Sequence, residues 1–397
     1  MAAQVVAALA NFVIQVFAAR ELGAAGLGTF AFLFGALVMA TALSSGLVGD
    51  SLTVLDRHDQ AIRTALWQVT WTLVAVSSLA AAVLGGSRLS VPVGLLFATA
   101  TASYVLADLA RRVLMARLRF WDLVTTDGAA LLVTVLVLAG SSALATPRLE
   151  HFLAALTAGQ TTAVVLAWSR LPRSERGASM RGRGDWGAVV GYGGWRALQQ
   201  FIRPTTLNAA RWLVLLAAGT AVVGVLEVAR VLVAPAMLLV QGLGSYLFAS
   251  YAADRGRPTS DLRTRADRAA ATMVAGAVVV GGVVAVALPV VGDLVSGGAF
   301  EVSAVAVLGW SAYAASCAAV MPYGSLAAVR GRQAAVLLVR LVDSLASLAL
   351  VAMLVLGMGL DPHLTPWLLS AGAFLGGLLC RQVLLADPAR RGRRRTL

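Results

Sequence analysis

The sequence has little of what a soluble enzyme requires. Of its 397 residues, 13% are charged, three are histidine and two are cysteine. Cys317 and Cys380 stand far apart in apolar stretches, so they predict neither a disulfide framework nor a metal cluster. His58, His151 and His363 lie in separate loops and share no spacing typical of metal ligands. We therefore expect no metal site.

Signals for a catalytic or nucleotide-binding domain are also missing. The sequence has no Walker loop, no nucleophile elbow and no pair of carboxylates in a loop long enough to hold an active site. Gly182, Gly184 and Gly187 spell G-x-G-x-x-G, but a basic loop with no strand before it is the wrong context for a dinucleotide site. Lysine is absent too, which is typical of a GC-rich genome and indicates no mechanism. We expect neither enzymatic activity nor a cofactor.

Hydrophobic residues dominate the chain instead. They make up 59% of the sequence, and the mean hydropathy is +0.82. A membrane-spanning helix needs about 20 apolar residues, so a dozen of them would occupy roughly 240 positions and leave only short connections. We therefore predict an all-α, polytopic membrane protein with about 12 transmembrane helices. The apolar runs lie near residues 1–19, 26–47, 65–85, 91–107, 123–142, 151–168, 188–210, 219–247, 270–292, 303–328, 334–358 and 365–386.

The arginines predict the orientation of the chain. Lys and Arg together number 32, all of them arginine, and the net charge is +13. Most of them fall in alternate loops that share one side of the membrane with the C-terminal tail, and an arginine-rich side is the cytoplasmic one. We therefore expect a multi-pass protein of the bacterial inner membrane with both termini in the cytoplasm. The tail arginines are expected to set this topology, and binding of anionic lipid is the alternative.

The spans divide into two sets of six. Residues 1–168 predict an N-terminal six-helix lobe, 169–186 a cytoplasmic basic linker, 187–386 a C-terminal six-helix lobe and 387–397 a basic cytoplasmic tail. An offset of 196 residues aligns identical residues of the two halves. The pairs are Gln4 with Gln200, Gly23 with Gly219 and Gly28 with Gly224. Because six is even, the repeats must have the same orientation, related by an axis along the membrane normal.

The seventh span carries an unexpected polar face. A charge near the centre of a bilayer costs at least about 2.5–3.5 kcal/mol, so each one needs a partner, a wet cavity or a function. Helical spacing gathers five of these side chains on one face. They are Arg196, Gln199, Gln200, Arg203 and Arg211. Asn208 joins this polar stripe only if the helix is distorted. Either the stripe lines an aqueous path, or its arginines pair with carboxylates or carbonyls in a static bundle.

Other charged residues are candidates for coupling or gating. Glu227 and Arg230 are three residues apart and can form an ion pair on one helix face, either facing a lumen or in the interior of the bundle. Asp343 has the same spacing from an arginine, and there we favour a structural pair. Asp50 closes the second span, as an ordinary interfacial acid or as part of a gate. Arg20 marks the outer end of the first span, where it either lines a cavity or anchors the helix at the interface.

Short motifs in both halves resemble a known family. The opening Gln4, Asn11, Ala19-Arg20, Leu22-Gly23 and Gly28-Thr29-Phe30, and the second-half run from Gly219 to Arg230, resemble the polysaccharide-exporting (Wzx-like) flippases of the multidrug/oligosaccharidyl-lipid/polysaccharide (MOP) superfamily. The resemblance covers all twelve spans in layout. One departure is Arg211, in a region where the family often has an acidic residue.

The resemblance implies a MATE-like fold of two six-helix lobes and a flippase function. Such a flippase moves an undecaprenyl-diphosphate-linked oligosaccharide from the cytoplasmic to the outer leaflet by alternating access. An arginine stays ionised and grips phosphate with two hydrogen bonds, which suits this cargo. We expect the diphosphate at Arg196 and Arg203, sugar hydroxyls at Gln199 and Gln200, and the exit at Arg20 and Arg211, with Asn208 as a weaker candidate.

Two other functions remain open at this point. A MATE-type drug or metabolite antiporter would use a buried acid for Na⁺ or H⁺ coupling, and Glu227 and Asp343 are the candidates. A non-transporting scaffold for envelope assembly would have a packed, dry polar stripe. As partners we expect the lipid-linked oligosaccharide, membrane lipids and the polymerase and glycosyltransferases of polysaccharide biosynthesis, and no nucleic acid.

Overall fold

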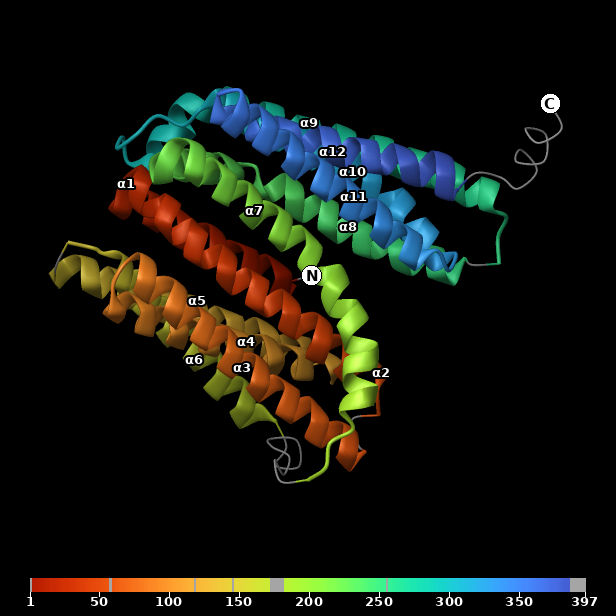
Figure 1. Cartoon of the computed structure of the whole chain (residues 1–397), viewed down its shortest axis with the longest axis horizontal. Helices are drawn as coiled ribbons and strands as arrows, with labels where there is room; N and C mark the ends of the chain where they lie inside the picture. The colour runs from red at the N-terminus through yellow and green to blue at the C-terminus, as the bar shows by residue number, and fades with distance from the viewer. Residues whose placement is uncertain are drawn as a thin grey trace. The chain divides into compact units, whose positions relative to one another are not determined.

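The computed structural model describes residues 2–56, 59–117, 119–144, 146–171, 182–254 and 256–385. Most of the predicted linker, the predicted tail 387–397 and His58 lie outside the described residues. Every regular element in the described part is helical, and the ribbon in Figure 1 follows them in chain order. The α-helices are α1 (Ala2–Ser44), α2 (Asp50–Val54), α3 (Gln60–Arg88), α4 (Val91–Ala116), α5 (Phe120–Leu144), α6 (Leu149–Arg170), α7 (Trp186–Leu232), α8 (Ala234–Ala253), α9 (Thr259–Ser296), α10 (Ala304–Val329), α11 (Gln333–Val351) and α12 (Thr365–Leu379).

Shorter helical turns extend or join these helices. A π-helical turn, η1 (Ser45–Gly49), links α1 to α2. Two further π-helical turns, η3 (Ala352–Gly357) and η5 (Cys380–Leu384), continue α11 and α12, and a 3-10 turn, η4 (Pro362–Leu364), precedes α12. Single π-helical turns are often found at functional sites, and η1 leads directly into Asp50.

The predicted membrane spans find their counterparts in the described helices. Ten of these helices are long and apolar enough to cross a bilayer. Two of the ten contain a glycine with a non-helical backbone, Gly23 (φ 64°) in α1 and Gly219 (φ 81°) in α7, and each glycine interrupts its helix where the sequence places the boundary between two spans. A left-handed φ strains any residue with a Cβ atom. The apolar pattern therefore locates these two breaks correctly, although several helices are longer than the predicted spans.

One predicted span is much too short. The sequence places it at 270–292, whereas α9 runs from Thr259 to Ser296. Three arginines, Arg263, Arg265 and Arg268, lie in the added first turns. A hydropathy window stops at such charges, but a helix does not, because a long side chain can place its charged end away from the apolar surface.

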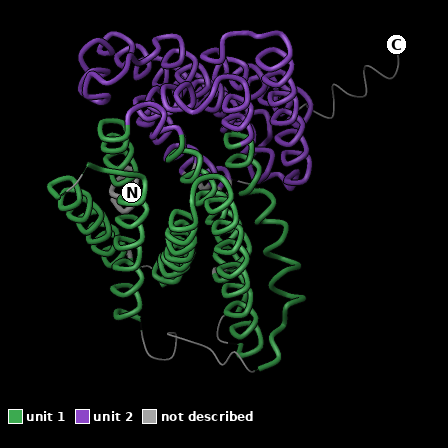
Figure 2. The backbone as a smooth tube through the Cα atoms, turned by 60° about the vertical axis from the view of Figure 1, so that its left-hand side comes forward, with its two compact units in different colours: residues 1–22, 29–208 green, residues 23–28, 209–397 purple. Residues whose placement is uncertain are grey.

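The chain forms two compact units, which Figure 2 shows in different colours. Unit 1 consists of Met1–Leu22 and Thr29–Asn208, and unit 2 of Gly23–Gly28 and Ala209–Leu397. The compact units thus divide the chain within α7, and residues 187–208 belong to unit 1 rather than to the second half. The predicted lobe boundaries at 168 and 187 stay a prediction.

Close packing on unit 1 explains why the start of α7 belongs there. Gln68 on α3 donates a hydrogen bond to Gly182 O (3.1 Å) and accepts one from Trp186 Nε1 (2.7 Å). A Cβ atom added at Gly184 would lie 2.7 Å from Ala65 Cα. Gly182 and Gly184 therefore pack against α3.

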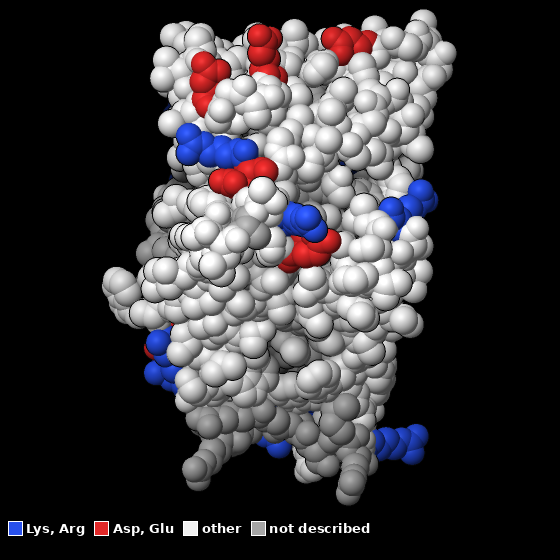
Figure 3. Space-filling model, turned by 90° about the vertical axis from the view of Figure 1, so that its left-hand side faces the viewer, with Lys and Arg blue, Asp and Glu red and all other residues white. Residues whose placement is uncertain are grey.

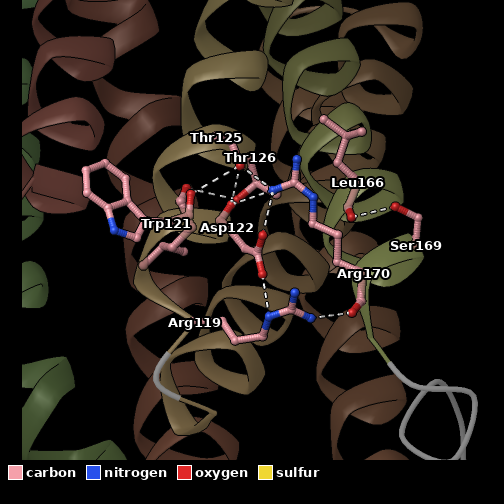
Figure 4. A network of polar contacts seen from close by, with 9 residues as sticks. Arg119, Trp121, Asp122, Thr125, Thr126, Leu166, Ser169 and Arg170 are labelled. Atoms are coloured by element: carbon pink, nitrogen blue, oxygen red, sulfur yellow. Dashed lines mark hydrogen bonds and ion pairs between the residues drawn. The ribbon is translucent and has the colours of Figure 1, made fainter.

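A polar network ties the ends of α5 and α6 together in unit 1 (Figure 4). Asp122 in the first turn of α5 pairs with Arg119 and Arg170, the latter at 3.5 Å. Arg119 Nη1 also donates to the carbonyl of Arg170 (2.8 Å), and Arg170 Nη1 donates to the carbonyl of Asp122 (3.0 Å) and to the hydroxyl of Thr125. A carboxylate near a helix N-terminus and an arginine near a helix C-terminus both complement the helix dipole.

Unit 2 is built around α10, which packs against α8, α9 and α12. Small residues make this possible: Ala314, Ala318 and Ala327 are fully buried, and small side chains let helices approach closely without a hydrophobic driving force. On the face of the molecule drawn in Figure 3, charged side chains are scattered over a surface that is otherwise uncharged. Such a surface suits a protein whose helices meet lipid.

Two glycines in unit 2 form a reciprocal contact. A Cβ atom added at Gly28 would lie 1.9 Å from Thr220 O, and one added at Gly224 would lie 1.9 Å from Ala24 O. Residues 24 and 220 are themselves 196 positions apart, as are Gly28 and Gly224. The offset derived from the sequence therefore describes a contact that is symmetric in three dimensions, and both glycines are needed for the close approach.

Candidate functional site

Three predicted polar residues of α7 form one cluster with Asp50 in unit 1. Arg196 Nε and Gln200 Nε2 both donate to Asp50 Oδ2, at 2.8 and 2.9 Å. Arg196 Nη1 donates to Gln199 Oε1 at 2.9 Å. The side chain of Arg196 is 40% exposed and that of Asp50 is 15% exposed. The cluster therefore joins the predicted stripe to the predicted gating acid and leaves one guanidinium accessible.

Small residues position this cluster. A Cβ atom added at Gly46 would lie 2.3 Å from Ala197 Cα, and one added at Gly193 would lie 2.3 Å from Leu47 O. The backbones of η1 and α7 are thus in direct contact, as small residues at helix interfaces allow. Because η1 ends immediately before Asp50, this contact sets the carboxylate against Arg196.

The other stripe residues in unit 1 lie further along α7. Asn208 is 5% exposed and donates through Nδ2 to Gly35 O at 2.7 Å. Its amide therefore has a backbone partner, and its predicted contact with substrate stays a prediction. Arg203 is half-buried, directly before Pro204. Thr205 and Thr206, one turn after Phe201 and Ile202, donate their hydroxyls to those carbonyls, so both hydroxyls find partners within the helix.

Unit 2 contains a buried ion cluster of Arg211, Glu227 and Arg230. Arg211 Nη2 lies 2.9 Å from Glu227 Oε2, and Arg230 Nε donates to Glu227 Oε1 at 2.8 Å. The side chains of Arg211, Glu227 and Arg230 are 15%, 3% and 27% exposed. The pairing of Glu227 with Arg230 is confirmed. Arg211 shares the same carboxylate, a partner that the sequence did not predict, and its role at an exit stays a prediction.

Two predicted residues lie apart from these clusters. Arg20 is exposed in unit 1. Asp343 in unit 2 accepts a hydrogen bond from Ser344 Oγ at 3.3 Å, and a Cβ atom added at Gly376 would lie 2.1 Å from its Oδ2. The roles of both residues stay predictions.

A cavity of about 440 Å³ lies inside unit 1 and was not predicted from the sequence. It is lined by side chains of α1, α4, α5 and α6. Two acids and two arginines face it: Arg111 Nη1 lies 3.0 Å from Asp127 Oδ2, and Arg112 Nε lies 3.7 Å from Asp108 Oδ1. The cavity is therefore polar and balanced in charge.

The signals for this cavity were present in the sequence. Asp127 falls inside the predicted span 123–142, where an acid indicates a function. Arg111 and Arg112 fall beyond the predicted span, which ends at 107, whereas α4 continues to Ala116. That extension carries both arginines and Asp108 on one helix.

Within the described residues, no group of three or more His, Cys, Asp or Glu side chains could hold a metal ion. The free cysteines Cys317 and Cys380 are half-buried and buried. The clusters thus offer guanidinium, carboxylate and amide groups, which bind anions and polar organic molecules through hydrogen bonds.

Comparison with known proteins identifies the fold. No family model and no curated protein sequence matches the chain. An inward-facing multidrug resistance MATE family transporter of the MOP superfamily matches with a TM-score of 0.77 at 12% identity, over 98% of this chain and 94% of the other. An outward-facing structure of such a transporter matches with a TM-score of 0.64 at 13% identity, over 100% and 93%.

A flippase has a similar structure. The lipid II flippase MurJ, in an inward closed conformation, matches with a TM-score of 0.70 at 11% identity, over 98% of this chain and 87% of the other. The predicted all-α, MATE-like architecture and the predicted multi-pass membrane protein are thereby confirmed. The chain has the fold of the MOP superfamily transporters.

Proposed function

We propose that the protein is a flippase that moves an undecaprenyl-diphosphate-linked oligosaccharide from the cytoplasmic to the outer leaflet by alternating access. One observation carries this proposal: α7, a membrane-spanning helix, holds four arginines and a single acid, Glu227. Such an excess of one sign within a bilayer is costly and marks an ion or substrate pathway. A diphosphate bears negative charge on both of its phosphates and is the complementary ligand.

Arg196 is the residue best placed to exchange partners. Its bond to Asp50 is 2.8 Å long, but its side chain is 40% exposed, so a second acceptor can reach the guanidinium. A phosphate can therefore compete with the carboxylate, since arginine binds phosphate through two parallel hydrogen bonds. Arg203 would bind the same group from its position two turns along the helix, and Gln199 and Gln200 would then meet sugar hydroxyls.

The structural relatives support a transporter with this cargo. One is a lipid II flippase, and the transporters include inward-facing and outward-facing structures. In this proposal the protein lies in the bacterial inner membrane with both termini in the cytoplasm. It works beside the glycosyltransferases and the polymerase of polysaccharide biosynthesis.

The test is a flipping assay with the double variant Arg196→Gln and Arg203→Gln. Proteoliposomes contain an undecaprenyl-diphosphate-linked oligosaccharide with a fluorescent label, and an impermeant reductant reports how much reaches the outer leaflet. Hydrogen bonds to charged groups contribute about 1.5–3 kcal/mol each, so the rate should fall at least about ten-fold for every such bond lost. The control is Arg268→Gln, on the exposed side of α9.

The alternatives give different outcomes. If the double variant flips the lipid at the wild-type rate but differs from the wild type in drug efflux, the protein is a MATE-type antiporter. If neither activity changes, the polar stripe is structural and the scaffold function stands.

A further inference from the structure

The cavity of unit 1 has a composition that selects among ligands. Its charged lining residues are Asp108, Arg111, Arg112 and Asp127, and the two arginines lie within 3.7 Å of the two acids. An organic cation would need an excess of carboxylates and an anion an excess of arginines. Neither excess exists in this lining, so its charges favour a neutral ligand with many hydrogen-bonding groups.

Uncharged groups of the cavity match such a ligand. Asn11, Thr41, Tyr104 and Gln160 bring amides and hydroxyls that both donate and accept hydrogen bonds. Phe34 and Tyr104 meet edge to face, with ring centroids 6.1 Å apart and planes at 87°, and both rings line the cavity. Aromatic walls with a few placed polar groups are typical of small-molecule sites, and an aromatic ring packs well against the C–H face of a sugar.

Asp127 contributes a carboxylate to the cavity lining. Its side chain is 7% exposed, and its Oδ2 lies 3.0 Å from Arg111 Nη1. Removing this carboxylate would leave Arg111 without its ion-pair partner, so Asp127 maintains the charge balance of the lining.

We infer that this cavity binds a sugar residue of the transported glycan. The inference rests on the proposed function only in naming the transported glycan as the source of the sugar. The position of the cavity supports this link to the substrate. Ser45 Oγ donates to Asp108 Oδ2 (2.7 Å) and accepts from Arg112 Nη2 (2.8 Å). Ser45 begins η1, which ends immediately before Asp50, the partner of Arg196. The sugar site and the proposed diphosphate site are thus joined by one turn of backbone.

The experiment measures binding of free sugars to the full-length protein in nanodiscs. Saturation-transfer difference NMR is recorded with glucose, galactose and N-acetylglucosamine at millimolar concentration. The variants are Asp127→Asn, which removes the carboxylate, and Thr41→Trp, which fills the cavity. Their matched controls are Asp293→Asn and Thr272→Trp, both on exposed positions of α9. Thermal unfolding checks that each protein is folded.

We expect at least one sugar to give a signal with the wild type and both controls, reduced at least five-fold in both cavity variants. No sugar signal with the folded wild type, or equal signals in the cavity variants and their controls, would overturn the inference. A folded wild type that gave no sugar signal but bound tetraphenylphosphonium, with that binding lost in Asp127→Asn, would instead indicate a site for organic cations.

Failure of the sugar site and failure of the proposed function are distinguishable. The free sugars carry neither lipid nor diphosphate, so the variant Arg196→Gln with Arg203→Gln should keep the sugar signal while losing flipping. The variant Thr41→Trp should still flip undecaprenyl diphosphate but flip the glycosylated lipid at least five-fold more slowly. Equal rates for both lipids in this variant would contradict the glycan site without contradicting the proposed flippase function.

Discussion

The reciprocal glycine contact in unit 2 predicts that a single methyl group at either position weakens the fold. In the variants Gly28→Ala and Gly224→Ala, the new Cβ atom would lie 1.9 Å from a backbone carbonyl oxygen. A backbone carbonyl cannot rotate away as the end of a long side chain does. The two segments must therefore move apart, which breaks the packing around the crossing.

The geometry allows an estimate of the size of this effect. Overpacking of a well-packed site costs about 1–3 kcal/mol, and contact with backbone at both positions points to the upper part of that range. With a shift of about 2–4 °C for each kcal/mol, the midpoint of thermal unfolding should fall by about 5–10 °C. Because one separation of the segments relieves both clashes, the double variant should lose less than the sum of the single variants.

Tryptophan fluorescence of the purified protein in detergent measures the unfolding midpoint. Gly276→Ala and Gly282→Ala on α9 are the controls, since a Cβ atom added at either position meets nothing within 4 Å. Alanine favours helix over glycine by about 1 kcal/mol, so the controls should unfold at the wild-type temperature or slightly above it. If Gly28→Ala and Gly224→Ala behaved like these controls, the close approach of the two segments would be refuted.

Two further predictions concern the ion clusters. Glu227→Gln removes a carboxylate that is 3% exposed and pairs with both Arg211 and Arg230. Because breaking a buried pair costs about 3–5 kcal/mol, the midpoint of thermal unfolding should fall strongly, while that of the exposed control Glu301→Gln should stay unchanged. Equal midpoints for the two variants would contradict the buried cluster. Asp50→Asn removes the negative charge that pairs with Arg196, whose side chain is 40% exposed while that of Asp50 is 15% exposed. Isothermal titration with an isoprenyl diphosphate should then show affinity raised by up to about five-fold. Weaker binding would count against partner exchange.

The helices and their breaks follow from local features of the sequence. A run of apolar residues predicts a span wherever it stands, and a glycine between two runs predicts a turn. The pairing of Glu227 with Arg230 was predictable for the same reason, since a spacing of three fixes both on one helix face. Even the contact of Gly28 and Gly224 left a trace in the sequence, as the offset of 196 between repeated residues.

The partners of the site residues could not be predicted from local features. Asp50 and Arg196 are 146 positions apart, and no periodicity links them. The cavity joins four helices of unit 1, and the arginines of α4 that line it fall beyond the predicted span because hydropathy ends a span at the first charged residues. Helix length is decided by backbone hydrogen bonds and packing, so α4 continues through Asp108, Arg111 and Arg112 to Ala116.

Arg196 and Arg211 of the polar stripe both pair with a carboxylate, as the static-bundle interpretation expects, but the two pairs differ in exposure. Arg211 meets a carboxylate that is 3% exposed, and removing either partner would leave a buried charge, so this pair behaves as a fixed structural element. Arg196 also meets a carboxylate, but its side chain is 40% exposed and its contact with Asp50 depends on a π-helical turn. An accessible guanidinium is suited to exchange its acid for a phosphate. Binding of the anion is therefore expected at Arg196, and Arg211 should instead govern stability. A diphosphate that protected Arg211, and not Arg196, from an arginine-specific dicarbonyl reagent would reverse this assignment.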